Sequence, residues 1–154
     1  MSFRRALLPL IAVFAAAFSA PAKSASPEGL WLAEDQTGRI RIEKCGNEMW
    51  GFLAWQKEAR SDSNNPNPAL RNKSLVGVPI LLGMKPAGDD RWEGNVYNPR
   101  DGKTYSSKIA MLSSGKLEIK GCVMSFLCSG ENWTRLAQDP PGTAPKTNCA
   151  GVQR

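Results

Sequence analysis

The stretch RIRIEKCGNEMWGFLAWQ, Arg39–Gln56, contains two β-type segments that flank a Gly-Asn pair. In the first segment apolar and charged residues alternate strictly, so that Ile40 and Ile42 fall on one face of an extended chain. The other face carries charged side chains: Arg39, Arg41 and Glu43. Such alternation predicts a half-buried strand, and Gly46-Asn47 is typical of a tight turn. We therefore expect an antiparallel hairpin.

Six further segments have strand character and are bounded by turn residues. They are Gly29–Ala33, Leu75–Leu82, Arg91–Tyr97, Thr104–Leu112, Lys116–Val123 and Asn132–Leu136. About eight short strands without a long amphipathic helix predict an all-β fold. We expect a small antiparallel up-and-down β-barrel, because closure leaves no exposed strand edges.

The N-terminal segment has the order of a secretory signal. Arg4 and Arg5 precede an apolar run at residues 6–18, and small residues follow. This predicts a signal peptide at residues 1–22, with cleavage near Ser24 or Ala25 as alternatives to cleavage after Ala22. A buried N-terminal helix is the competing interpretation. The run is shorter than the ~18 apolar residues of a spanning helix, so we expect no membrane span and a periplasmic or secreted protein.

Removal of 22 residues from 154 leaves 132, enough for one domain. We expect a single β-barrel domain at residues 23–138. Residues 139–154, DPPGTAPKTNCAGVQR, are predicted to form an extended tail that only Cys149 ties down.

Charge and composition exclude several kinds of function. The signal segment holds two arginines and no acid, so the formal charge falls from +6 to +4 on cleavage. The basic residues form no cluster, so we expect no nucleic-acid partner, although weak attraction to anionic envelope components remains open. The chain contains no His, which removes the commonest general base and a frequent zinc ligand. We expect no catalytic residues, no metal and no other cofactor.

Two motifs at the ends of the predicted barrel are similar to the lipocalin and calycin pattern. Gly29-Leu30-Trp31 opens the first strand, and Trp133-Thr134-Arg135 lies in the last. In that pattern the arginine stacks on the first-strand tryptophan and closes one end of the barrel. The alternative is that Trp31 and Trp133 are ordinary core aromatics.

The segment after the signal also resembles a bacterial family known as domain of unknown function 2147. The matching stretches are Gly29-x-Trp31, Cys45-Gly46, Gly51, Asp62-x-x-Asn65-Pro66-Asn67-Pro68-x-Leu70-Arg71, Gly77, Trp92-x-Gly94-x-x-Tyr97-x-Pro99-x-x-Gly102-Lys103-Thr104-Tyr105, Gly121-Cys122 and Trp133-Thr134-Arg135. The resemblance implies an exported single domain with a small calycin-like barrel, and it brings no assigned reaction.

The four cysteines predict two disulfides in an exported chain, with three possible pairings. Where many members of the resembled family have a second cysteine five residues after the first, this chain has Trp50. Cys149 is then the expected substitute partner of Cys45, and Cys122 pairs locally with Cys128. In the alternative, Cys149 is free and Cys45 pairs with Cys122 or Cys128.

The run SDSNNPNPALRNKSLVGVPIL, Ser61–Leu81, offers Asp and Asn oxygens of the kind that calcium prefers. Counted from Asp62 as an EF-hand loop, however, the required Gly and Glu positions hold Asn67 and Lys73. We favour a stiff structural turn that also forms part of a binding rim, with Asp62 and Asn65 as ligand-binding candidates.

The leading functional hypothesis is a binding module for a small apolar or amphipathic ligand or an envelope component. The candidate lining residues are aromatic: Trp50, Trp55, Trp92, Tyr97 and Tyr105. These side chains could equally fill a solid interior, which would favour a structural or inhibitor-like interaction protein. An enzyme comes third, because Asp101 and Lys103 beside a turn glycine are more simply explained as solvated charges.

Overall fold

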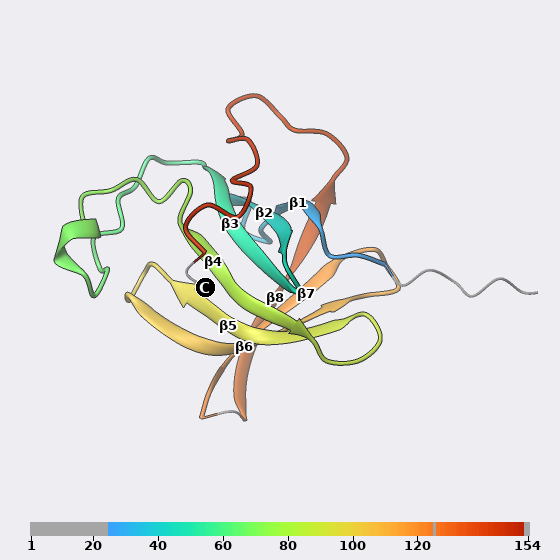
Figure 1. The fold of residues 1–154 in the computed structure, drawn as a ribbon. Helices are drawn as coiled ribbons and strands as arrows, with labels where there is room; N and C mark the ends of the chain where they lie inside the picture. Colours follow the sequence, from blue (N-terminus) through green and yellow to red (C-terminus); the bar gives the residue numbers. More distant parts are fainter. Residues whose placement is uncertain (1–24, 125, 153–154) are drawn as a thin grey trace, which may run out of the picture.

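The computed structural model describes residues 25–124 and 126–152; the predicted signal peptide lies outside them. The described chain forms a closed antiparallel barrel in which each strand pairs with the next and β8 pairs with β1 (Figure 1). The strands are β1 (Gly29–Leu32), β2 (Gly38–Cys45), β3 (Glu48–Gln56), β4 (Pro79–Pro86), β5 (Arg91–Asn98), β6 (Lys103–Met111), β7 (Leu117–Val123) and β8 (Leu127–Leu136). The predicted all-β barrel and its number of strands are therefore confirmed.

Because consecutive strands run in opposite directions, the connections alternate between the two ends of the barrel. The β1–β2, β3–β4, β5–β6 and β7–β8 connections lie at one end, which we call the mouth. The start of β1 and the other three connections lie at the opposite end, which we call the base. The β3–β4 loop is the longest connection at the mouth and contains a 3-10 turn at Pro68–Leu70, and the β7–β8 hairpin extends away from the barrel body (Figure 1).

Apolar side chains from around the whole barrel fill its interior. Ile40 and Ile42 belong to the core cluster, which confirms the face assignment made from their alternation. Trp31, Leu81 and Leu117 are completely shielded from solvent. Strands on opposite sides of the barrel thus share one apolar core, and the burial of apolar surface provides the main stabilisation.

Two strands differ from the sequence prediction by more than one residue. The strand expected at Leu75–Leu82 begins only at Pro79 and continues to Pro86. The backbone of Leu75 instead donates to Arg60 O, which keeps this part of the chain in the loop. The last strand begins at Leu127 rather than Asn132, because direct pairing with β7 continues up to Val123.

The C-terminal tail packs on the barrel instead of being held only through Cys149, so that part of the prediction is wrong. It covers the outer face of β2, where Arg41 and Glu43 are buried although their alternation predicted exposure. Arg41 forms an ion pair with Asp139 at 2.7 Å. Glu43 accepts hydrogen bonds from the backbone amides of Thr147 and Cys149. Buried charges need such partners, and the tail supplies them.

The two disulfides have the pairing that the sequence analysis favoured. Cys45 is joined to Cys149, which ties the tail to β2 at the base. Cys122 is joined to Cys128 across the β7–β8 hairpin at the mouth end. Each end of the barrel is thus braced by one covalent bridge.

The base is closed by Arg135, whose guanidinium carbon lies 4.2 Å from the centre of the Trp31 ring. Arg135 also donates to the carbonyls of Glu28 and Ser26, at 2.5 and 2.6 Å. Gly29 makes this approach possible, because a Cβ atom there would lie 2.6 Å from Arg135 Nη1. The Gly-x-Trp and Trp-Thr-Arg motifs therefore meet in one closing contact.

Candidate functional site

The β3–β4 loop is fastened to the barrel by a buried hydrogen-bonded group. Asp62 is only 1% exposed. It accepts a hydrogen bond from Tyr97 Oη at 2.6 Å and one from Asn65 Nδ2 at 2.6 Å. Burial and the adjacent Asp62 carboxylate raise the pKa of Tyr97 to about 12. The structure thus brings together three of the predicted ligand-binding candidates, Asp62, Asn65 and Tyr97. Their hydrogen bonds attach the β3–β4 loop to β5 and so have a structural role.

The other Asx side chains of this loop also bind the protein's own backbone. Asn64 Nδ2 donates to the carbonyls of Pro99 and Arg100. Asn65 Oδ1 and Asn67 Oδ1 accept from backbone amides two residues further along the chain. The described residues contain no group of three or more His, Cys, Asp or Glu side chains suited to a metal ion. The side chains that resembled calcium ligands are engaged in shaping the loop.

A hollow of about 260 Å³ opens at the mouth between the ends of β1–β2, β3 and β5–β6. Its apolar lining includes Leu53, which packs against the core cluster, and the buried Leu75. Lys57, Arg60 and Arg100 line its exposed part. The hollow therefore has an apolar floor beneath a rim with three cations.

The rim charges differ in how they are compensated. Arg60 pairs with Glu58 at 3.0 Å, and Arg100 pairs with Asp35 of the β1–β2 turn at 3.2 Å. Hydrogen bonding from the Thr37 backbone amide, with a smaller contribution from Arg100, lowers the pKa of Asp35 and favours its charged carboxylate. Within the described part of the chain, no carboxylate pairs with the Lys57 ammonium. Lys57 is thus available to an anionic group.

A larger hollow of about 480 Å³ lies along β5 and β6 nearer the base. Two of its lysines already have acidic neighbours, since Lys108 pairs with Glu93 and Lys120 pairs with Glu118. Its lining consists largely of outward-facing charged side chains. The mouth hollow combines the apolar side chains of Leu53 and Leu75 with Lys57, a cation without an acidic partner in the described chain. We therefore take the mouth as the candidate site.

The predicted aromatic residues do not form one lining. Trp50 and Trp55 lie on the outer face of β3, opposite Glu43 and Arg39 respectively. Trp50 donates to Glu48, whose carboxylate pairs with Lys85 on β4. The hypothesis that these two tryptophans line the interior is wrong, because β3 turns them to the face away from the core.

The remaining aromatic candidates have separate environments. Trp92 belongs to the core cluster. Tyr105 is half-buried and lies near the β5–β6 turn. Tyr105 Oη donates to Asp101 at 2.5 Å, which lowers the pKa of Asp101 and raises that of Tyr105. The backbone amide of Lys103 also donates to Asp101. Asp101 therefore stabilises the turn together with Tyr105.

Sequence reasoning missed the residues that form the mouth hollow, namely Leu53, Leu75, Lys57, Arg60 and Arg100. Their only common signal is position, because all lie in the connections at the mouth or, for Leu53, in the part of β3 nearest the mouth. Leu75 was assigned to a strand, which concealed its place beside the mouth. A count of charges within each connection would have drawn attention to the β3–β4 loop.

Comparison with known proteins places the chain in a family. The model of a family described as an uncharacterized protein conserved in bacteria, DUF2147, matches residues 29–135. The chain belongs to this family. The match covers all eight strands except the last residue of β8, so the DUF2147 region and the barrel coincide.

Among solved structures, this DUF2147 member is similar to protein HP1028 from the human pathogen Helicobacter pylori, which belongs to the lipocalin family. The two are 25% identical, with a TM-score of 0.66, over 73% of this chain and 84% of the other. No curated protein matches the sequence. Within residues 25–124 and 126–152, no helix is long and apolar enough to cross a membrane.

Proposed function

We propose that the protein is an exported binding module whose mouth accepts a small amphipathic ligand with an acidic head group. The observation that carries the proposal is the hollow in which Leu53 and Leu75 lie beneath Lys57, Arg60 and Arg100. An apolar segment would displace water from the two leucines, while a carboxylate or phosphate would pair with the rim. Lys57 is the principal anchor because it has no acidic partner in the described chain.

The size of the hollow limits the ligand. Ligand pockets commonly have volumes of ~300 to 1,000 Å³, and about 260 Å³ lies just below that range. The site therefore suits a short-chain ligand or one end of a longer one. Similarity to a lipocalin-family structure supports this proposal, because small barrels of this type hold ligands at their mouths.

Export is the second part of the proposal. It rests on the signal-like order of residues 1–22 and on two disulfides, which persist in oxidising compartments. Intact mass of fractionated protein should show a chain that begins near Lys23. An unprocessed chain in the cytoplasm would contradict export and would leave the mouth hypothesis to its own test.

Ligand binding is tested by calorimetric titration with a series of linear fatty acids from hexanoate to dodecanoate. Affinity should rise with chain length, by at most about fourfold per methylene where the added group is fully buried, and then level off when the hollow is full. Decanol should bind more weakly than decanoate. Equal affinity for the acid and the alcohol, or no dependence on chain length, would contradict the proposed site.

A charge-reversal pair locates the binding site. Lys57→Glu should reduce decanoate affinity roughly tenfold, since it replaces an attractive charge with a repulsive one at the solvent-exposed rim of the hollow. Lys116→Glu makes the same change at the base and should have no effect, because Lys116 lies in the β6–β7 turn. If both variants bind decanoate like the wild type, the ligand does not occupy the mouth. Native mass spectrometry of protein purified from the periplasm would then reveal which molecule, if any, is retained.

A further inference from the structure

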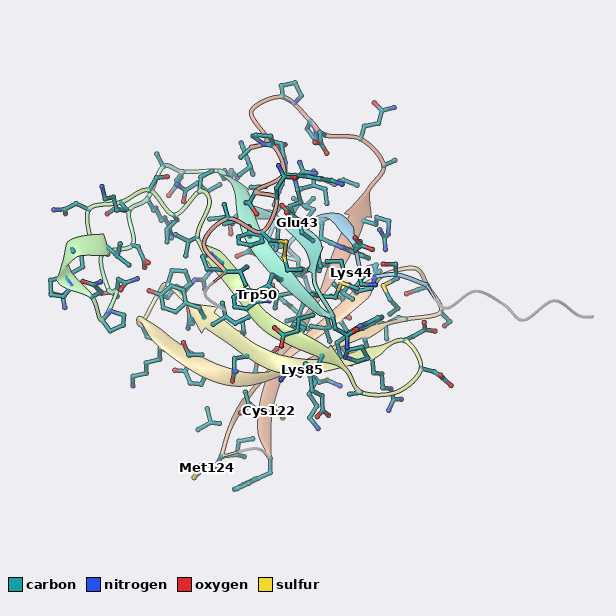
Figure 2. All side chains as sticks on the ribbon, in the orientation of Figure 1. Glu43, Lys44, Trp50, Lys85, Cys122 and Met124 are labelled. Carbon is teal, nitrogen blue, oxygen red and sulfur yellow. A yellow bond between two sulfur atoms is a disulfide. The ribbon has the colours of Figure 1, made fainter. Side chains whose placement is uncertain are left out.

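The tip of the β7–β8 hairpin exposes a concentration of large apolar side chains. Six such side chains are exposed among the described residues, and four of them belong to this tip. They are Val123, Met124, Phe126 and Leu127, with Met124 and Phe126 exposed by 69% and 72%. Figure 2 places Met124 at the far end of the hairpin, away from the barrel body. None of the four contributes to the core cluster.

The backbone at the tip restricts which residues suit the turn. Met124 has φ of 51°, in the left-handed region where glycine and asparagine are favoured over bulky residues. Methionine therefore has a conformational cost at this turn and also exposes its side chain to water. A tight hairpin turn can itself require a positive φ. The exposure of the methionine side chain, however, is not explained by the core, so we look for a contact outside the barrel.

The hairpin is built to keep this apolar tip in place. Cys122 and Cys128 are directly opposite each other in the β7–β8 pairing and are joined by a disulfide just beneath the tip. The ten-residue segment Gly121–Gly130 contains no charged residue. A covalently closed, uncharged hairpin can enter an apolar phase without leaving a charge unsolvated.

We propose that the β7–β8 tip inserts into the surface of a lipid bilayer that contains anionic head groups. Four partly exposed side chains offer far less than the ~800 Å² per partner of a stable protein interface, whereas shallow insertion of a few apolar groups is sufficient for reversible membrane attachment. The β3–β4 loop at the same end carries Arg71 and Lys73, which complement anionic head groups. The proposal rests on the proposed export only in that an exported chain meets envelope membranes.

Flotation with lipid vesicles tests the proposal directly. Wild-type protein should float with mixed phosphatidylethanolamine and phosphatidylglycerol vesicles and bind phosphatidylcholine vesicles less. The variant Met124→Asn/Phe126→Ser should bind vesicles with roughly tenfold lower affinity, because it removes the two most exposed apolar side chains of the tip. Asparagine tolerates the left-handed turn and both positions are exposed, so the variant should melt like the wild type.

The matched control is Leu70→Ser, which removes an exposed leucine from the β3–β4 loop. Because Leu70 is a single side chain and is less exposed than Met124 and Phe126, this variant should lose much less vesicle binding than the tip variant. Equal binding by wild type and the tip variant would overturn the proposal, as would an equal loss in Leu70→Ser, which would indicate general adhesiveness. The proposal would also be overturned if the wild type formed a dimer and bound no vesicles while the tip variant was monomeric. That result would identify a second copy of the chain as the partner of the tip.

Oxidation provides a readout that needs no substitution. Hydrogen peroxide should convert the exposed Met124 to its sulfoxide in free protein, and vesicles should protect it by severalfold. Met84 is fully buried and serves as the internal control. Equal oxidation of Met124 with and without vesicles would contradict insertion. Decanoate binding by the tip variant distinguishes the two proposals, because the mouth hollow does not include the tip.

Discussion

At the base of the barrel Arg135 stacks on Trp31 and donates to two carbonyls over a glycine that leaves room for it. At the mouth, the β3–β4 loop is held by the buried Tyr97–Asp62 hydrogen bond, and an exposed ion pair connects two turns. The base is closed by contacts of β8 with β1 and with the residues just before β1, whereas the mouth is surrounded by loops that are fastened to the barrel. Loops with few buried contacts open at lower free energy than paired strands. The two ends should therefore differ in rigidity, and a ligand should enter at the mouth.

The largest difference in stability between the two ends should appear when each disulfide is removed in turn. Cys45–Cys149, at the base, spans a sequence separation of 104, whereas Cys122–Cys128 spans 6. In the chain-entropy account, Cys45→Ser/Cys149→Ser should lower the free energy of unfolding by about 4 to 5 kcal/mol and Cys122→Ser/Cys128→Ser by about 2 to 3 kcal/mol. Urea unfolding measures both values. A larger loss from the mouth bridge would reverse the proposed order.

Gly29→Ala tests the close approach at the base. The new Cβ would meet Arg135 at a backbone φ of 137°, so we expect a loss of about 3 kcal/mol. Gly46→Ala is a matched change, since Gly46 also has positive φ but nothing within 4 Å of the added Cβ. It should cost about 1 kcal/mol from backbone strain alone. Equal costs in thermal melts would show that the contact with Arg135 is unimportant.

Arg135→Ala should destabilise the barrel by about 2 kcal/mol, because it removes the stacking on Trp31 and two hydrogen bonds. The comparison at the mouth is Arg100→Ala, which breaks an exposed ion pair and should change stability by no more than about 0.5 kcal/mol. Melting temperatures of the two variants give the result. Similar melting of Arg135→Ala and wild type would refute the closing role of the stack.

The smallest effects are expected for two tyrosines that each donate to an aspartate. Tyr97→Phe leaves the buried Asp62 without one donor and should cost about 1 to 2 kcal/mol. Tyr105→Phe removes the equivalent bond to the exposed Asp101 and should cost less than about 0.5 kcal/mol. Hydrogen exchange of the β3–β4 loop should increase in the first variant only.

The contribution of Tyr97 should also depend on pH. Its pKa is raised from 10.0 in the ordinary side chain to about 12 in the folded protein, so folding favours the neutral phenol. The stabilisation is complete below pH 10 and is lost as the pH rises towards 12. The stability difference between wild type and Tyr97→Phe should therefore diminish over that interval. A constant difference would show that the phenol is not the group responsible.

Local patterns predicted the strands and the base well. Alternation placed Ile40 and Ile42 in the core, and the paired motifs at residues 29–31 and 133–135 meet as expected. The burial of Arg41 and Glu43 could not be predicted from their alternation, because the tail that covers them follows about a hundred residues later. Trp50 and Trp55 were misplaced because composition identifies aromatic residues but not the face to which the strand register turns them.

The mouth was least predictable because its hollow is formed by parts of several connections. Leu75 and Arg100 meet there only because the β3–β4 loop folds back on the β5–β6 turn, where Asn64 donates to two carbonyls. Neither residue belongs to a motif with a recognisable spacing. Such a site depends on closure of the whole barrel and cannot be read from any single segment.

The buried Glu43 also affects the order of folding events in time. Its amide donors, at Thr147 and Cys149, lie 104 and 106 residues further along the chain. Until those last residues are available, β2 presents a carboxylate without its native partners and the barrel lacks its outer cover. Contacts of such long separation form slowly. A chain that crossed a membrane with its N-terminus first would therefore acquire this cover, and the Cys45–Cys149 bridge, only after its last residues had emerged.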